Sequence, residues 1–394
     1  MEKQITNITP TFEERIEHYR AIVDDVSFPT VREWKANHPG SKVVGMFPVY
    51  TPYELPHAMG MLPVGLQGAG GKIEIDHADS RIQSFVCSIA RSTLELGLTD
   101  RLKDFDAVYF TSICDVARNL SGVWQTNFPR QLVEYIHFPQ NVTSRAAAVH
   151  YRAELQRLLR NLEALGVKKL TDAALTESIA TYNRNRALCS RLYEIRQATP
   201  WLLSTYEAYI LLRIGTLIPV EEHSQILEEV IPAIGTRDRK TRDYVRVVLE
   251  GSFCEQPPLE LLQVIEEAGC YIVNDDLLLH SRWFSQPVAV EGDPLHALAT
   301  SYILHSVSSS VRHYGNKPRK QEFLEKVNAA NADGVIFCAP KFCDPALLDY
   351  VMLKDELEKQ GVAYFAFEYE EKMGVFESIR TQIETFVESV LFFS

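Results

Sequence analysis

Two stretches of this sequence, AVYFTSICD at residues 107–115 and GVIFCAPKFCD at residues 334–344, follow the same plan. Each is an apolar run of β type that ends on a cysteine followed by an aspartate, with Cys114 in the first stretch and Cys343 in the second. In open α/β sheets, ligands and chemistry lie beyond the carboxyl ends of the strands. We therefore expect each half of the chain to present one thiol from the edge of its own sheet to a shared site.

Eight short apolar runs alternate with segments that favour helices, and four of them fall in each half of the chain. Continuous apolar strands between helices are typical of parallel sheets that are covered on both faces. The runs are residues 42–47, 62–66, 107–112, 133–138, 245–251, 270–275, 334–339 and 363–368. The predicted fold class is α/β, with two Rossmann- or flavodoxin-like parallel-sheet domains, an N-terminal helical segment and a helical insertion.

The chain of 394 residues is longer than one hydrophobic core usually serves, so more than one domain is expected. Between the two groups of strands, leucines and charged residues recur at three-to-four spacing, which indicates helices. The predicted parts are an N-terminal helical segment at residues 1–40, a first α/β domain at 41–145 with Cys87 and Cys114, a helical insertion at 146–241, and a second α/β domain at 242–394 with Cys343.

Charge and cysteine content narrow the class of protein. The formal net charge is -12, and no stretch combines clustered Lys and Arg with aromatic residues, so nucleic acid is not expected as a partner. The longest uncharged run, residues 55–71, is broken by prolines and glycines, so we expect no membrane span. Seven cysteines, together with a polar and acidic start that lacks the layout of a secretory signal, predict a protein of the reducing cytoplasm.

Cys87, Cys114 and Cys343 form the leading set of candidate ligands for a metal or an iron–sulfur centre. No CxxC pair occurs, but soft thiolates from separate segments suit a cluster held between two domains. If the centre is an iron–sulfur cluster, three protein ligands would leave one of its irons open to substrate. Zinc is the competing metal, yet catalytic zinc sites usually mix histidine or carboxylate with few thiols, and the eleven histidines form no HExxH motif.

The remaining thiols are weighed against the ordinary role of free cysteine as a small buried hydrophobe. Cys338 lies inside an apolar run, Cys189 lies in a helical segment and Cys270 opens a strand, so all three are expected to be packed. Cys254, in GSFCEQPP, follows a strand and should lie at the same sheet edge as Cys343. Nucleophilic catalysis by Cys254 or by Cys114 is the alternative to ligation.

Two further features follow the first predicted strands. In YTPYELPHAMG at residues 50–60, Glu54 is a candidate proton donor that could point into the cleft, whereas a structural role is favoured for His57. The glycine stretch at residues 65–71 lacks both the GxGxxG fingerprint and the P-loop pattern, so the chain shows no nucleotide site of its own. A flexible turn is expected there, because glycine clusters usually mark turns, and a close approach of the backbone to a ligand or cluster is the alternative.

Several segments together resemble the 2-hydroxyacyl-CoA dehydratase and benzoyl-CoA reductase family. They are FPVYTPYELPHAMGMLPVG at residues 47–65, the Cys87 segment, YFTSICDVARNLSGVW at 109–124 and FCDPALLDYVMLKDELEKQGV at 342–362. Residues 219–227 and 251–276 look most like the smaller of the core, non-ATPase subunits of ATP-dependent benzoyl-CoA reductases. The likeness covers nearly the whole chain, and its motifs fall in order.

The resemblance implies that Cys87, Cys114 and Cys343 hold a [4Fe–4S] cluster between the two α/β domains. It also implies a second core iron–sulfur subunit, ATPase activator subunits with their own [4Fe–4S] cluster, and a low-potential ferredoxin as electron donor. ATP would be used by those partner subunits and not bound by this chain. Cys254 and Cys338 have no ligand role in the family pattern.

The activity implied by the resemblance is the two-electron ring reduction of an aromatic acyl-CoA, benzoyl-CoA, to a cyclohexadiene-carbonyl-CoA in anaerobic aromatic degradation. The first alternative is a subunit of a radical 2-hydroxyacyl-CoA dehydratase, which uses a similar site to remove water. The second is a subunit that only relays electrons, with the substrate bound by its partner.

Overall fold

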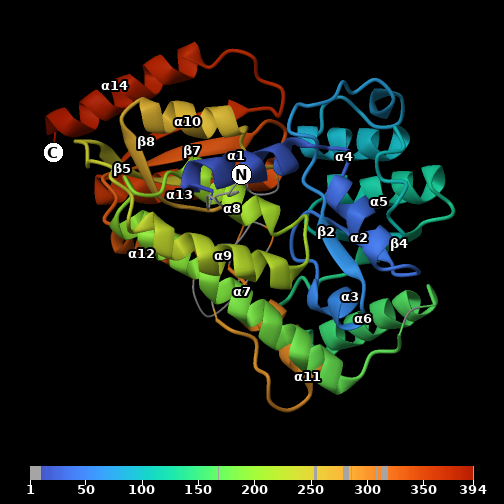
Figure 1. Cartoon of the computed structure of the whole chain (residues 1–394). Helices are drawn as coiled ribbons and strands as arrows, with labels where there is room; N and C mark the ends of the chain where they lie inside the picture. Colours follow the sequence, from blue (N-terminus) through green and yellow to red (C-terminus); the bar gives the residue numbers. More distant parts are fainter. Residues whose placement is uncertain are drawn as a thin grey trace, which may run out of the picture.

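The computed structural model describes residues 10–166, 168–252, 255–277, 284, 286–307, 309, 311 and 318–393. Within them lie two four-stranded sheets in which every strand pair is parallel, and helices flank both sheets. The two sheets occupy opposite sides of the molecule in Figure 1. The predicted α/β class is therefore confirmed, and all eight predicted strands form.

The first sheet has the order β2-β1-β3-β4. Helices α3, α4 and α5 and the short 3-10 helix η1 connect or flank its strands. The bounds are β1 Val43–Phe47, α3 Glu54–Ala58, β2 Leu62–Gly65, η1 Ala78–Ser80, α4 Ser88–Leu98, β3 Ala107–Thr111, α5 Asp115–Asn127 and β4 Leu132–Ile136.

The second sheet has the order β6-β5-β7-β8, which repeats the order of the first sheet strand for strand. Its elements are β5 Val245–Glu250, α10 Leu259–Glu267, β6 Cys270–Asp275, α12 Arg319–Ala329, β7 Gly334–Pro340, α13 Asp344–Gln360, β8 Ala363–Tyr369 and α14 Glu377–Phe393. In both sheets the strand order reverses between the first and the third strand along the chain. Parallel sheets bind ligands at such a switch point, outside the carboxyl ends of the strands.

Seven further helices complete the described structure: α1 Phe12–Asp24, α2 Pro29–Asn37, α6 Ala147–Glu163, α7 Asp172–Ala198, α8 Thr205–Ile214, α9 Val220–Ile234 and α11 Pro294–Leu304. In Figure 1 the long helix α7 runs along the lower side of the molecule, from below the second sheet toward α11. Helix α11 follows β6 in the chain, yet it packs on α6 and α7, and its buried side chains join the hydrophobic core of the first sheet. The domain boundaries at residues 40, 145 and 241 stay predictions.

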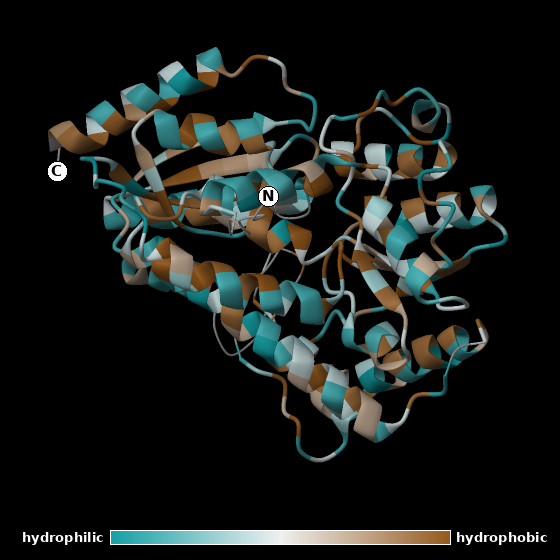
Figure 2. Cartoon of the chain, in the orientation of Figure 1, coloured by the Kyte–Doolittle hydropathy of each residue, from teal (hydrophilic) through white to brown (hydrophobic). Residues whose placement is uncertain are grey.

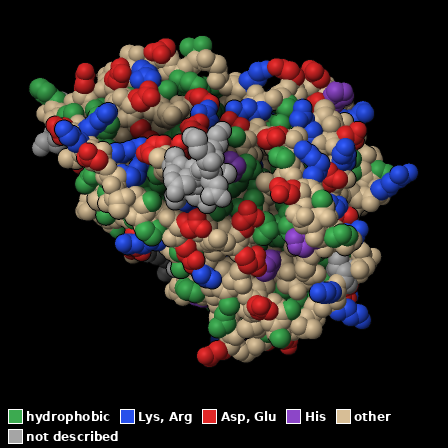
Figure 3. All heavy atoms as spheres, in the orientation of Figure 1, with side chains coloured by type: hydrophobic (Ala, Val, Ile, Leu, Met, Phe, Trp, Pro, Cys, Tyr) green, Lys and Arg blue, Asp and Glu red, His purple; other side chains and the backbone are tan. Residues whose placement is uncertain are grey.

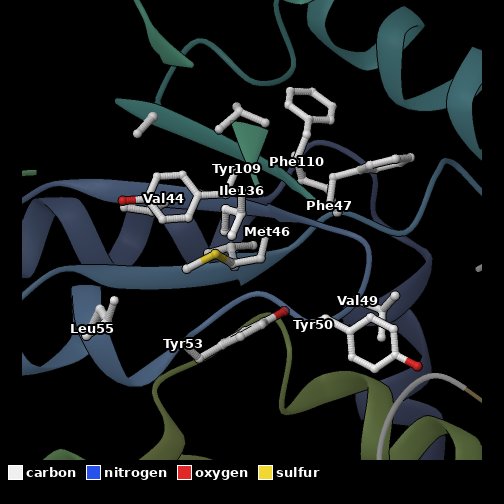
Figure 4. Close-up of a cluster of buried hydrophobic side chains, with 14 of the residues drawn as sticks. Val44, Met46, Phe47, Val49, Tyr50, Tyr53, Leu55, Tyr109, Phe110 and Ile136 are labelled. Carbon is white, nitrogen blue, oxygen red and sulfur yellow. The ribbon is translucent and has the colours of Figure 1, made fainter. Parts of the chain in front are cut away.

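The strands are apolar because both faces of each sheet are covered. All residues of β1, β3 and β7 are buried, and the strands appear brown inside the ribbon of Figure 2. Figure 4 shows side chains of β1 and β3, among them Met46 and Phe110, packed with the segment that follows β1. Parallel strands that are buried on both faces lose the alternation of apolar and polar residues, which is why each reads as a continuous apolar run.

The surface carries both signs of charge. Figure 3 shows acidic and basic side chains mixed across one face of the molecule. None of the helices in the described residues combines the length and the apolarity that a membrane span needs.

A buried ion pair ties α7 to the second sheet. Arg196, in the last turn of α7, pairs with Asp275 at the carboxyl end of β6, and both side chains are buried. Tyr193 Oη donates to Asp275 Oδ1 over 2.8 Å, and the Leu277 amide donates to the same oxygen over 2.9 Å. Because the carboxylate has several donors, its burial is compensated.

We expect Asp275→Ala to lower the free energy of unfolding by about 3–5 kcal/mol, because the variant leaves the Arg196 charge buried without its partner. Urea unfolding of both proteins measures this difference. The matched control is Glu228→Ala, which breaks the surface pair between α9 and Arg184 of α7 and should cost no more than about 1 kcal/mol. Equal losses in the two variants would contradict the assignment.

Candidate functional site

Three cysteines occupy the same structural position at the start of three helices. Cys87 is the N-cap of α4, Cys114 is the N-cap of α5 and Cys343 is the N-cap of α13. Cys114 and Cys343 each lie three residues beyond the last residue of the third strand of their sheet, β3 or β7. The first amides of a helix have no partner within it, and they carry a partial positive charge that favours a thiolate at this position.

All three cysteines line one cavity of about 520 Å³. The residues around it come from both halves of the chain, and most of the wall is apolar. The apolar lining consists of Phe47, Pro48, Ile89, Ala90, Ile113, Val116, Ala117, Val311, Phe342, Pro345 and Leu348, and the polar lining includes Ser112, Asp115, Arg118, Tyr135, Gln140 and Asp344. The structure thus brings together the three thiols that the sequence singled out.

The cavity disfavours free thiolates unless a cation is present. Cys87 and Cys343 are buried and Cys114 is half-buried. Burial raises the pKa of Cys87 well above its ordinary value, and Glu255, Cys343 and Cys114 raise it further. Burial also raises the pKa of Cys114, against the lowering effect of nearby backbone amides, of which the Ala117 amide donates to Sγ over 3.4 Å. A positively charged group bound by all three thiolates would remove their mutual repulsion.

The three thiols are not arranged around a single metal ion. In the described part of the chain, no three or more His, Cys, Asp or Glu side chains are grouped so that they could hold one metal ion. In a cubane cluster each thiolate binds a different iron, so the thiolates need not converge on one point. The donor set is three soft sulfurs at helix N-termini in a largely apolar cavity. Iron–sulfur clusters use donors of this kind.

Glu54 lies apart from this cavity. Its side chain is 1% exposed and pairs with Arg186 over 2.7 Å, and it is not among the described residues that line the cysteine cavity. Ser178 Oγ donates to the Glu54 carbonyl over 3.0 Å, and His57 connects Ser178 to Glu221 through contacts of 2.8 Å at each ring nitrogen. Here Glu54 and His57 join α3 to α7 and α9. A catalytic role for Glu54 stays a prediction.

Of the other four cysteines, three lie in a hydrophobic core and the fourth lies outside the described residues. Cys189, Cys270 and Cys338 are buried in the hydrophobic core that lies around the second sheet, as expected for packed thiols. Cys254, the other candidate for a catalytic role, lies outside the described residues, so its role stays a prediction.

The glycine stretch after β2 cradles a carboxyl group, a role that the sequence analysis missed. Gly68 has a φ of +76°, and a Cβ atom at this position would lie 1.8 Å from Glu371 Oε1. Ser92 Oγ donates to the same oxygen over 3.0 Å. Glu371 comes from the segment after β8, so the glycines allow the second half of the chain to insert a side chain into the first. Glycines separated from their acidic partner by about 300 positions give no local signal of this contact.

A second buried carboxyl neighbours Glu371. Glu255 accepts a hydrogen bond from the amide of Ile89, near the start of α4, over 2.9 Å. Burial and the neighbouring Glu371 raise the pKa of Glu255 well above its ordinary value. Burial raises the pKa of Glu371 to about 7, against the lowering effect of the hydrogen bonds from Ser92 and the glycine stretch. Two neighbouring buried carboxyls resist being ionised together.

Comparisons with known proteins agree with this architecture. The family model described as HGD-D, 2-hydroxyglutaryl-CoA dehydratase, D-component, matches residues 48–390. The chain is 42% identical over 375 residues to the C subunit of benzoyl-CoA reductase from Thauera aromatica, covering 95% of this chain and 97% of that protein. It is 31% identical over 350 residues to the beta subunit of lactoyl-CoA dehydratase from Anaerotignum propionicum, covering 89% and 92%. These matches confirm the resemblance that the motifs indicated.

Glu371 should make stability depend on pH. The unfolded chain releases this proton near a pKa of 4.5, whereas the folded protein holds it to about pH 7. The stabilisation is therefore complete below pH 4.5 and is lost as the pH rises through 7, by on the order of 3 kcal/mol at about 1.4 kcal/mol per pKa unit. We expect Glu371→Gln to lose less stability than the wild type between pH 5 and pH 8, as measured by urea unfolding.

The matched control is the adjacent residue. Glu370 pairs with Lys341 at the surface, so Glu370→Gln should follow the wild-type dependence on pH. A Glu371→Gln profile parallel to the wild type would show that this carboxyl does not hold a proton in the folded protein.

Proposed function

Because the chain belongs to the 2-hydroxyglutaryl-CoA dehydratase, D-component family, we propose that it is an iron–sulfur core subunit of an ATP-dependent benzoyl-CoA reductase. The observation that carries this proposal is the meeting of three helix-capping cysteines in one cavity. The reductase is favoured over other activities of the family because the identity to a protein named as a benzoyl-CoA reductase subunit is 42%, against 31% to one named as a dehydratase subunit.

Cys87, Cys114 and Cys343 would hold a [4Fe–4S] cluster, each through its thiolate. The cluster would supply one-electron transfer at low potential. The chain contributes the surroundings of those sulfurs: helix N-termini stabilise the thiolates, and the Ala117 amide donates to Cys114 Sγ. Apolar side chains such as Ile113 and Leu348 line the cavity and limit the access of water to the sulfurs.

The reaction proposed for the complete enzyme adds two electrons and two protons to the ring of benzoyl-CoA and yields a cyclohexadiene-carbonyl-CoA. A second core iron–sulfur subunit would complete the enzyme. ATPase activator subunits with their own [4Fe–4S] cluster, reduced by a low-potential ferredoxin, would deliver electrons as they hydrolyse ATP. We place the complex in the cytoplasm of an anaerobically growing cell, where the reduced cluster is protected from oxygen.

A radical 2-hydroxyacyl-CoA dehydratase is the second candidate, and a specific observation favours it: the family model carries the name of a dehydratase. A related chain, the beta subunit of (R)-2-hydroxyglutaryl-CoA dehydratase from Acidaminococcus fermentans, is 26% identical over 356 residues, covering 89% of this chain and 93% of that protein. A third role, an electron relay with the substrate bound by the partner subunit, is compatible with the position of Glu54 outside the cysteine cavity.

We expect the anaerobically purified protein, with its partner subunit, to be brown and to carry about four irons and four sulfides per copy of this chain. Cys114→Ala or Cys343→Ala should lose this iron, because each removes a thiolate ligand. The controls Cys189→Ala and Cys338→Ala shrink packed side chains, cost about 1–3 kcal/mol and should keep the iron. Iron analysis and visible spectra measure the difference; colourless wild-type protein with stoichiometric zinc would exclude the cluster.

The activity itself requires the whole complex. This chain alone should neither hydrolyse ATP nor reduce benzoyl-CoA. With the second core subunit, the activator and a strong reductant, it should form the dienoyl-CoA only when ATP is present, and oxygen should abolish the activity. Product analysis by mass spectrometry measures the outcome. A complex that dehydrates a 2-hydroxyacyl-CoA and leaves benzoyl-CoA unchanged would replace the reductase with the dehydratase.

A further inference from the structure

Arg213 is a buried cation that has no counter-ion among the described residues. Its side chain, near the end of α8, is 7% exposed, and no carboxylate is among the described groups that act on it. Its guanidinium donates to the Gly65 carbonyl over 3.4 Å and to Thr216 Oγ1, both neutral acceptors. Burial lowers the pKa of Arg213. Arginine is almost never fully buried unless it is paired, because taking an unpaired charge out of water is costly.

The guanidinium borders a pocket of about 80 Å³, which we call the Arg213 pocket. Its described walls are residues 23–26, Phe28, residues 67–70 of the glycine stretch, Lys72, Tyr209 and Arg213 of α8, Leu217, residues 256–260 and Glu371. Among the described residues, it shares no lining residue with the cysteine cavity. A single water needs roughly 10–15 Å³ of such space, so the Arg213 pocket has room for a small ion.

Two other polar side chains of the Arg213 pocket also lack partners in the described structure. Tyr209 lies one helical turn before Arg213, so both project from the same face of α8. Tyr209 is buried, and the described residues act on its hydroxyl through the charges of Arg213, Glu371 and Asp24 and not through a hydrogen bond. Gln67 Oε1 is also buried without a partner. Flipping this side-chain amide, so that its oxygen and nitrogen exchange places, would present the NH₂ group to the same space. The pocket therefore brings together the Arg213 guanidinium, which is bonded to neutral acceptors only, the Tyr209 hydroxyl and the Gln67 amide.

The acids at the rim of the pocket have their own partners. Asp24 pairs with Lys72 over 3.2 Å and with Arg20 over 3.6 Å. Glu260 lies 3.8 Å from Arg20. These acids are therefore neutralised locally and leave the charge of Arg213 uncompensated.

The two remaining acids of the lining do not neutralise Arg213. Asp25 accepts a hydrogen bond from the Ser27 amide over 2.9 Å. Glu371, held by the glycine stretch, has a pKa of about 7 and so keeps its proton at mildly acidic pH. Arg213 is then a fixed positive charge that faces a pocket open to a small anion.

We propose that the Arg213 pocket binds a small oxyanion, a carboxylate or a phosphate, through the guanidinium of Arg213 and the hydroxyl of Tyr209. Guanidinium groups bind such anions through paired hydrogen bonds. Burial raises the pKa of Tyr209 to about 12, so its hydroxyl stays a donor at neutral pH. Both binding groups lie on α8, and the bound anion stabilises the folded state because it neutralises the buried charge of Arg213. This site is independent of the iron–sulfur proposal.

The test is calorimetric melting of the full chain at pH 6 in sodium chloride, and in sodium acetate or sodium phosphate of equal ionic strength. We expect acetate or phosphate to raise the Tm above its value in chloride, because a ligand that binds only the folded state stabilises it. The anion that acts identifies the class, carboxylate or phosphate. The proposal is overturned if neither anion raises the Tm.

Arg213→Met separates a binding arginine from a structural one. The variant should lose the anion effect, and its Tm in chloride should equal or exceed that of the wild type, because it no longer buries an unpaired charge. A lower Tm in chloride with the anion effect intact would overturn the proposal. Should this variant fail to fold, Tyr209→Phe removes only one hydroxyl and should weaken anion binding about two- to tenfold.

Two further variants complete the design. Arg184→Gln removes an exposed arginine paired with Glu228 and should keep the anion effect; its loss there would indicate general surface binding and overturn the proposal. At pH 8 the ionised Glu371 should weaken anion binding in the wild type, whereas Glu371→Gln should retain it. Equal weakening in both proteins would contradict the arrangement of charges proposed for this pocket.

Discussion

The candidate site depends on one structural feature, the point at which a parallel strand ends and the next helix begins. At this junction backbone amides point outward without partners, and the partial charge of the helix favours an anion. Cys114 and Cys343 occupy it at equivalent strands of two sheets with the same strand order, and Cys87 occupies the start of a third helix. Each thiol is positioned by main-chain geometry, so the arrangement requires little from neighbouring side chains.

Buried carboxyl groups also connect the two halves of the chain. Each core consists of buried apolar strands, but two acidic side chains of the second half reach the first: Glu255 reaches the start of α4, and Glu371 reaches the glycine stretch. Arg213 is buried and borders a pocket that Glu371 also lines. Buried polar groups must be neutral, paired or bound to a ligand. Protonation and small ions are therefore able to influence the contact between the halves, next to the helix that presents Cys87.

Local sequence accounted for the parts of the structure that arise from local physics. All eight strands were predicted because a strand covered on both faces is a continuous apolar run, whatever its partners. Cys114 and Cys343 stood out because each follows such a run at once. Glu54 was chosen by the same rule, yet it lies in an ion pair with Arg186, because the chain turns into α3 after β1 and carries that side chain toward α7.

The sequence by itself determined the α/β class, the eight strands and the three thiols that face one cavity, since each depends on a few consecutive residues. Only the tertiary structure decided that the glycine stretch holds Glu371 and that Arg213 is buried without an ion-pair partner among the described residues. It also decided that α11 belongs with the first core although it follows β6 in the chain. The physical reason is that burial and charge pairing depend on which distant segments meet. The residues next to a side chain in the sequence do not show which distant residues it will contact.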